Sequence, residues 1–196
     1  MRILAFSGST RSGSFNQQLV SIAASAAKEA GAQTSLISLR DFPMPLYDAD
    51  LEANEGMPAA AHEFRELLKG ADGILIASPE YNGGLSAVLK NAIDWSTRPD
   101  PASSDDPPLV AWRGKVVGIM AGGPGRLGGI RGLSHLRTIL SGIGSLVLPD
   151  QIAVPGIQDL LSEDVALSDE RLHASVVAIG VEVASIAASV RANPSG

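Results

Sequence analysis

Short apolar runs alternate with amphipathic helical patterns along most of this chain. The apolar runs, which predict strands, lie at residues 1–7, 33–39, 72–78, 115–121 and 145–148, and a further run at 151–154 could continue the last strand. Apolar residues at helical spacing follow at 14–30, 59–69, 85–95, 130–142 and 169–190. This alternation predicts an α/β fold, a three-layer sandwich in which helices cover both faces of a five-stranded parallel sheet.

The chain is expected to form a single domain. Its 196 residues are enough to bury a substantial core, and no internal repeat or linker interrupts the pattern. We assign residues 1–191 to this domain and 192–196 to a polar C-terminal tail, with Ser168 as the N-cap of the last helix. Two stretches rich in proline and acidic or hydroxyl residues, 40–58 and 97–108, are predicted to be exposed loops.

Composition excludes several classes of function. The net charge of −6 argues against a nucleic-acid partner, which would need a basic surface. The chain has no cysteine, so disulfides and thiolate nucleophiles are absent. No apolar run approaches the roughly 20 residues of a membrane span, and no secretory signal precedes the first strand. We therefore expect a cytoplasmic protein without a membrane partner.

Three loops rich in glycine, serine and asparagine each follow a predicted strand. They lie at 8–16, 79–84 and 122–129, after the first, third and fourth strands. With the strand order 2-1-3-4-5, these three strands are neighbours. Ligands of open parallel sheets bind at the carboxyl ends of strands, where the strand order reverses. We therefore expect the three loops to form one binding site.

The first loop has the composition of a phosphate-binding turn. Gly8 and Gly13 are spaced as in a P-loop, but Ser14 and Phe15 stand where that motif has its lysine and Ser/Thr. Without the lysine, backbone N–H groups, hydroxyls and the single guanidinium of Arg11 suit one terminal phosphate of a mononucleotide better than a triphosphate. The candidate donors are Ser9, Arg11, Ser14 and Asn16. The alternative is an ordinary turn in which Ser14 caps the following helix.

The second loop, Pro79-Glu-Tyr-Asn-Gly-Gly84, offers a carboxylate, a phenol and an amide. Its two glycines allow the backbone to approach a flat ring closely. Glu80 could act as a general base, although no nucleophile stands near it in the sequence. The alternative is a plain strand-to-helix turn with incidental polar residues.

The third loop contains Gly123-Pro-Gly-Arg-Leu-Gly128, which has the Gly-x-Gly-x-x-Gly spacing of dinucleotide-binding folds. This loop opens the penultimate strand–helix unit, so too little chain follows for the second half of such a fold. We interpret its glycines as exposed backbone that faces a ring. The three histidines, His62, His135 and His173, lack the spacing of metal ligands, and no metal site is expected.

Together these motifs resemble the NAD(P)H-dependent FMN reductase family, which includes quinone, chromate and azo reductases. The matching segments are Gly8-Ser-Thr-Arg-Ser-Gly-Ser-Phe-Asn16, Pro79-Glu-Tyr-Asn-Gly83, Leu89-Lys-Asn-Ala-Ile-Asp-Trp95 and the glycine turn at 122–129. The resemblance implies a flavodoxin-like fold, FMN as the cofactor, NADPH or NADH as the co-substrate, and a homodimer or homotetramer. The chain departs from the family at Gly84-Leu-Ser-Ala87, where the family often has Ser-x-Pro-Gly.

Carried over by position, the resemblance implies FMN contacts from all three loops. The implied cofactor-binding residues are Ser9, Arg11, Ser14, Phe15 and Asn16 in the first loop, Pro79, Glu80, Tyr81, Asn82 and Gly83 in the second, and Gly122, Gly123 and Gly125 in the third. The first loop would hold the phosphate, and the other two would enclose the isoalloxazine. Arg98 also matches a recurrent arginine of the family.

The implied reaction passes hydride from NAD(P)H through FMN to a small acceptor, such as a quinone, a flavin, an azo compound or a metal oxyanion. No catalytic side chain is expected, because the flavin carries the hydride chemistry. An alternative is a flavodoxin-like electron carrier without direct NAD(P)H turnover, and another is a binding or regulatory protein. The choice between NADPH and NADH needs an arginine for the 2′-phosphate, for which Arg98, Arg126 and Arg131 are candidates.

Overall fold

The computed structural model describes residues 1–100, 103, 105–162 and 164–192. Its centre is a five-stranded sheet made of β1 (Arg2–Ser7), β2 (Gln33–Ser38), β3 (Gly73–Ala77), β6 (Val116–Gly123) and β7 (Leu146–Pro155). The strand order is β2-β1-β3-β6-β7, and every neighbouring pair is parallel. These strands correspond to the five predicted ones. A separate two-stranded ladder, β4 (Glu80–Tyr81) and β5 (Gly84–Leu85), lies between β3 and β6 in the chain and was not predicted from the sequence.

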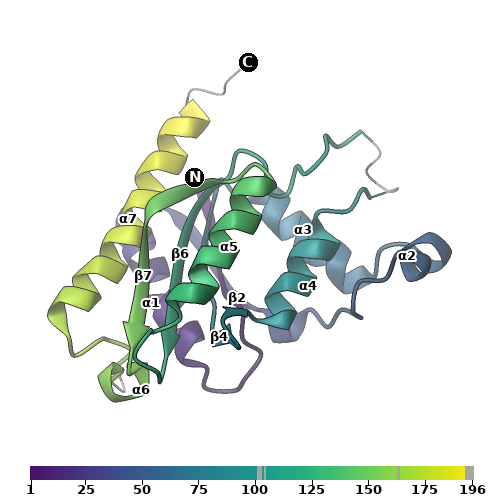
Figure 1. Cartoon of the computed structure of the whole chain (residues 1–196). Helices are drawn as coiled ribbons and strands as arrows, with labels where there is room; N and C mark the ends of the chain where they lie inside the picture. Colours follow the sequence, from purple (N-terminus) through teal and green to yellow (C-terminus); the bar gives the residue numbers. More distant parts are fainter. Residues whose placement is uncertain (101–102, 104, 163, 193–196) are drawn as a thin grey trace.

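Helices cover both faces of the sheet (Figure 1). The helices α1 (Phe15–Glu29) and α7 (Glu170–Ala192) pack together on one face, and α3 (Ala59–Gly70), α4 (Ala87–Ser96) and α5 (Ile130–Gly142) cover the other. Alternate side chains of β1 enter the two layers, Ile3 and Ala5 on the first face and Leu4 and Phe6 on the second. A strand that is buried on both faces reads as a continuous apolar run, which is the pattern of 1–7.

The connection from β2 to α3 contains two short helices where the sequence analysis predicted only a loop. The first is η1 (Leu39–Asp41), and the second is α2 (Ala49–Glu55). The Asp48 carboxylate caps α2 by accepting a hydrogen bond of 2.8 Å from the Asp50 N–H. Because α2 has no buried residue and projects from the body of the protein, no apolar periodicity marks it in the sequence (Figure 1).

Several boundaries also differ from the prediction. The strand β6 continues to Gly123. The run at 151–154 belongs to β7, as the sequence allowed, and the pairing of β7 with β6 shifts register between Val117 and Ile119. A short helix, α6 (Ile157–Leu160), follows β7. The helix α7 begins at Glu170, and it is Asp169 rather than Ser168 whose side chain accepts a hydrogen bond from the first turn, from the Leu172 N–H at 3.0 Å.

The helix α7 is long and apolar enough to cross a membrane, with a mean hydropathy of 1.6, so the expectation that no segment has this composition was wrong. Small residues raise its hydropathy without forming an obvious run of large apolar side chains. Its inward face, which includes Val176, Ile179 and Val183, is buried in the core beside α1. The apolar side chains on this face of α7 therefore form part of the core of the domain. Ala192, the first residue of the predicted tail 192–196, is the last residue of α7. Residues 193–196, and 101, 102 and 104 in the predicted loop 97–108, lie outside the described residues.

Candidate active site

The loops that follow β1, β3 and β6 meet at one edge of the sheet, as the strand order requires. The Gly8 N–H donates a hydrogen bond to the Ala77 carbonyl at 2.8 Å, and the Ser78 N–H donates to the Met120 carbonyl at 2.9 Å. These bonds join the start of the first loop to the end of β3, and the start of the second loop to β6. The helix α1 begins at this edge, so its N-terminus faces the same space.

The first loop presents polar groups that have no partner in the part of the chain that the structure describes. Ser14 is the N-cap of α1 and accepts a hydrogen bond from the Gln17 N–H at 3.3 Å, and the Ser9 hydroxyl accepts one from the Arg11 N–H at 3.3 Å. Among the described residues, no hydrogen bond is formed by the N–H groups of Ser12, Gly13, Phe15 and Asn16. Unpaired N–H groups at a helix N-terminus form an anion-binding site.

Arg11 supplies the positive charge for this loop. Its guanidinium lies 4.9 Å from the centre of the Phe15 ring in a cation–π contact. Within the described part of the chain it forms no ion pair, so its hydrogen-bond donors are available to a ligand. The structure thus gives Phe15 a position from which it orients Arg11.

The Asn16 side chain is bonded to the backbone of Gly122. Its side-chain amide donates to the Gly122 carbonyl at 2.9 Å and accepts from the Gly122 N–H at 2.9 Å. Each polar atom of the side chain therefore has a partner in Gly122, while the backbone N–H of Asn16 has none among the described residues. The residue fixes the start of α1 to the end of β6.

The second loop is a β-hairpin rather than a simple turn into a helix. β4 (Glu80–Tyr81) pairs with β5 (Gly84–Leu85), and α4 begins only at Ala87, two residues later than predicted. Asn82 and Gly83 have φ values of 52° and 83°, as the two-residue turn of such a hairpin requires. The hairpin leaves the Tyr81 side chain 56% exposed beside the site.

Glu80 is an anchor for α5 and not a free base. One carboxylate oxygen accepts hydrogen bonds from the N–H groups of Arg131 and Gly132, at 3.0 and 3.1 Å, and the other accepts one from Arg131 Nε at 2.7 Å. Burial raises the pKa of the Glu80 carboxyl, but these hydrogen bonds outweigh burial and leave the pKa below its ordinary value. Glu80 therefore stays ionised and fixes the hairpin to the N-terminus of α5.

The third loop and the hairpin enclose a cavity of about 420 Å³. It is lined by Pro79, Glu80, Tyr81, Gly122, Gly123, Pro124, Gly125, Arg126, Leu127, Gly128, Gly129 and Arg131. Gly123 and Gly125 line this space. Gly122 is required for another reason, because a Cβ there would lie 2.2 Å from Ile157 Cδ1. The sequence could not reveal this contact, since α6 was not predicted.

The three candidate arginines differ in their partners. Arg98 Nε donates to both carboxylate oxygens of Glu52, at 2.8 and 2.9 Å, and this hydrogen bonding holds the pKa of the Glu52 carboxyl below its ordinary value. Arg131 is bonded to Glu80. Only Arg126, among these three, has no hydrogen bond or ion pair within the described residues. Arg98 thus fixes α2 to the end of α4 and does not face the cavity at Tyr81.

The arrangement can hold a ligand that joins a flat group to a terminal phosphate. The cavity accommodates the flat group, and the N-terminus of α1 with Arg11 accommodates the anion. The residues described contain no cluster of three or more His, Asp or Glu side chains that could hold a metal ion. Glu80, a carboxylate in the lining of the cavity, is bonded to Arg131.

Residues 1–159 match the family model of NADPH-dependent FMN reductases. The chain belongs to this family. It is 37% identical over 148 residues to a quinone reductase of Escherichia coli, a match that covers 76% of this chain and 73% of the relative. It is 38% identical over 141 residues to an NAD(P)H-dependent FMN reductase of Pseudomonas aeruginosa, covering 71% of this chain and 69% of the relative.

Solved structures support the fold of this FMN reductase family member. The FerB flavoenzyme of Paracoccus denitrificans superposes with a TM-score of 0.75 at 23% identity, over 96% of this chain and 97% of that one. An archaeal flavodoxin superposes with a TM-score of 0.60 at 11% identity, over 96% of this chain and 99% of that one. The fold is flavodoxin-like, and family membership makes the protein an oxidoreductase with FMN as its cofactor.

Proposed function

We propose that this protein oxidises NAD(P)H and passes the hydride through bound FMN to a small organic acceptor, a quinone in the first instance. The observation that carries the proposal is the pairing of two features at one sheet edge. These are the unpaired N–H groups with Arg11 at the start of α1, and the glycine-lined cavity between the hairpin and the third loop. Together they match a flavin mononucleotide, which has a flat ring and a single terminal phosphate.

In this proposal the first loop binds the phosphate. Ser9 and Ser14 offer hydroxyl donors, and the N–H groups of Ser12, Gly13 and Phe15 point their partial positive charge at the anion. Arg11 neutralises part of the phosphate charge with hydrogen bonds that ionisation strengthens. Asn16 acts indirectly, since its side chain aligns the first and third loops.

The ring is proposed to lie between the hairpin and the third loop. Pro79 and Tyr81 line one side of this cavity, and Gly123 and Gly125 line the other. Asn82 and Gly83 form the turn of the hairpin and are proposed to contact the ring from there. Glu80 keeps the hairpin in place through Arg131. Bound FMN supplies the hydride-transfer chemistry, and the protein positions it and leaves a face open to NAD(P)H and the acceptor.

The choice of a quinone as acceptor is supported by the names of relatives. Beside the Escherichia coli quinone reductase, an NADPH:quinone oxidoreductase of Arabidopsis thaliana is 42% identical over 141 residues, covering 71% of this chain and 66% of that relative. Free flavins, azo compounds and metal oxyanions are the other acceptors to be compared. We further propose a cytoplasmic homodimer or homotetramer that has no nucleic-acid or membrane partner.

The second candidate is an electron carrier, which the superposition on an archaeal flavodoxin favours. The two functions differ in whether the purified protein turns over NAD(P)H without a separate reductase. The test is steady-state oxidation of NADPH and of NADH by the FMN-loaded protein, with and without a benzoquinone. Turnover that requires both the nicotinamide and the quinone supports the reductase. An FMN-loaded protein that oxidises neither nucleotide would be a carrier or a regulatory protein.

A further inference from the structure

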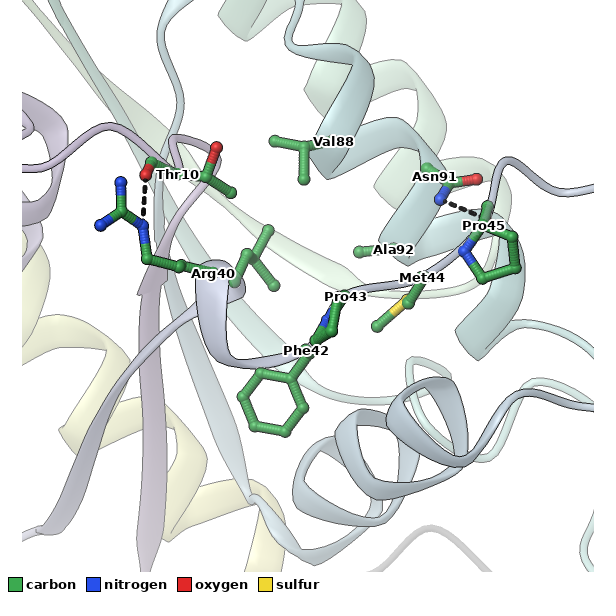
Figure 2. Close-up of a pocket in the computed structure, with 10 residues that line it drawn as sticks. Thr10, Arg40, Phe42, Pro43, Met44, Pro45, Val88, Asn91 and Ala92 are labelled. Carbon is green, nitrogen blue, oxygen red and sulfur yellow. Dashed lines mark hydrogen bonds between the residues drawn. The ribbon is translucent and has the colours of Figure 1, made fainter.

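A second cavity, of about 600 Å³, shares no lining residue with the one beside Tyr81. It lies between the segment that follows β2 and the helix α4, and Thr10 of the first loop borders it (Figure 2). Its lining consists of Thr10, Leu39, Arg40, Phe42, Pro43, Met44, Pro45, Val88, Asn91 and Ala92. Its volume is in the range of cavities that bind small organic ligands.

The walls of this cavity suit a flat aromatic group. Val88 and Ala92 of α4 face Pro43 and Met44 across the space in Figure 2. Proline rings and aliphatic side chains offer flat apolar surface, and a methionine thioether makes favourable contacts with aromatic rings. The lining contains a single charged residue, Arg40. A ligand that joins a flat ring to an anion matches this lining.

The wall formed by residues 43–47 is fixed to α4 by hydrogen bonds. The Pro45 carbonyl accepts bonds from Asn91 Nδ2 and Trp95 Nε1, both at 2.8 Å, and the Tyr47 N–H donates to Asn91 Oδ1 at 2.8 Å. The cavity therefore does not depend on a ligand to hold its walls apart. A preformed site binds with a smaller loss of conformational entropy.

Arg40 has donors available at the rim of the cavity. Its Nε donates to the Thr10 carbonyl at 2.9 Å, which fixes the side chain beside the first loop (Figure 2). Within the described residues its two terminal nitrogens have no hydrogen-bond partner, and the adjacent Asp41 forms no ion pair with it. A guanidinium held in this way presents a planar fork of N–H groups that matches a phosphate.

We propose that this cavity binds the 2′-phosphoadenosine end of NADPH, with Arg40 on the 2′-phosphate. The inference rests on the proposed function, because it assumes that NAD(P)H reaches the site. Arg98 and Arg131 are already bonded to Glu52 and Glu80. Arg126 lines the cavity assigned to the ring, whereas the 2′-phosphate is at the end of the dinucleotide remote from the nicotinamide. Arg40, in contrast, lies at the rim of a separate cavity that is large enough for an aromatic ring.

The test uses two fragments of the dinucleotide, 2′,5′-ADP and 5′-AMP, titrated calorimetrically into the FMN-loaded protein. Because neither fragment contains a nicotinamide, binding is measured without any flavin reduction. We expect 2′,5′-ADP to bind at least about tenfold more tightly than 5′-AMP, because only 2′,5′-ADP has the 2′-phosphate that can form a charge-assisted hydrogen bond with Arg40. Arg40→Ala should remove this preference, and Val88→Trp, which fills the cavity, should weaken both fragments. Arg126→Ala is the matched control and should keep the preference.

The outcomes separate this inference from the proposed function. A preference that survives in Arg40→Ala, or that is lost in Arg126→Ala, overturns the assignment of Arg40. If neither fragment binds to a protein whose flavin NADPH still reduces, the assignment of Arg40 is also overturned, while the proposed function stands. A flavin that NADPH and NADH both fail to reduce contradicts the proposed function instead. FMN content, measured from the visible spectrum of each variant, shows that the loop at Thr10 is intact.

Discussion

The side-chain amide of Asn16 and the backbone of Gly122, 106 positions apart in the chain, exchange two hydrogen bonds of 2.9 Å. Asn16 stands in the first turn of α1, and Gly122 lies near the end of β6. The pair therefore joins the anion-binding turn to the loop that lines the ring cavity. The geometry of the whole site depends on this connection.

Asn16→Ala should destabilise the protein. The change leaves a buried N–H and a buried carbonyl of Gly122 without partners, at a cost of about 2 to 4 kcal/mol in the free energy of unfolding. Urea denaturation of the FMN-free protein measures this loss. Ser12→Ala, an exposed change in the same loop, is the control and should stay within about 0.5 kcal/mol of the parent. An Asn16→Ala protein as stable as the control would show that the two bonds contribute little.

Arg11→Ala should weaken binding of FMN but not of riboflavin, which has the same ring and no phosphate. Loss of a charge-assisted hydrogen bond to a phosphate corresponds to about a tenfold or greater increase in Kd. Quenching of flavin fluorescence in titrations with both ligands measures the two affinities. Lys28→Ala removes a positive charge from the far end of α1 and should leave both affinities unchanged. Equal FMN affinity in Arg11→Ala and the parent would refute the phosphate assignment.

Glu80→Gln should lower the free energy of unfolding and make it depend less on pH in the acidic range. The pKa of Glu80 is below its ordinary value in the folded protein, so its stabilising effect is complete above the ordinary glutamate pKa and is lost as the pH falls through the folded pKa. At neutral pH we expect a loss of about 1 to 2 kcal/mol, because the α5 N-terminus and Arg131 lose an ionised acceptor.

Urea unfolding of the parent and of Glu80→Gln, at neutral pH and at a pH below the ordinary glutamate pKa, measures this effect. The difference between the two proteins should shrink at the lower pH. Glu63→Gln, on the exposed side of α3, is the control. A difference that stays constant across the pH range would mean that ionisation of Glu80 has no part in its role.

Gly122→Ala should destabilise the protein through a steric clash. The new Cβ would lie 2.2 Å from Ile157 Cδ1, and overpacking of a buried contact costs about 1 to 3 kcal/mol. Gly125→Ala is the matched control, since a Cβ there has no atom within 4 Å. Shortening the neighbour in the double variant Gly122→Ala/Ile157→Val should recover part of the loss. Additive effects of the two changes in thermal unfolding would exclude this clash.

The main architecture could be predicted because buried strands and amphipathic helices each leave a periodic pattern. The run at 1–7 became β1, and the helical spacing at 130–142 became α5 with the same bounds. The hairpin of β4 and β5 was missed although its signal was present, since Asn82-Gly83 is a favoured two-residue hairpin turn. Because Leu85 fits the apolar spacing of the following helix, the prediction placed the start of that helix at Leu85.

Other features could not be predicted because they depend on contacts between distant residues. The helix α2 buries none of its residues and is fixed through the bond between Arg98 and Glu52. The first loop could be identified as a phosphate site from its composition, but nothing local indicates that Asn16 bonds to Gly122. The same is true of Glu80, whose partner Arg131 is 51 positions away.

The central claim is that FMN bound at this sheet edge accepts hydride directly from a nicotinamide nucleotide and delivers it to a quinone. The most direct measurement follows the visible flavin absorbance of the FMN-loaded protein under anaerobic conditions, first with one equivalent of NADPH or NADH and then with a benzoquinone. We predict that the nucleotide bleaches the flavin band and that the quinone restores it. A band that persists in the presence of both nucleotides would contradict the claim.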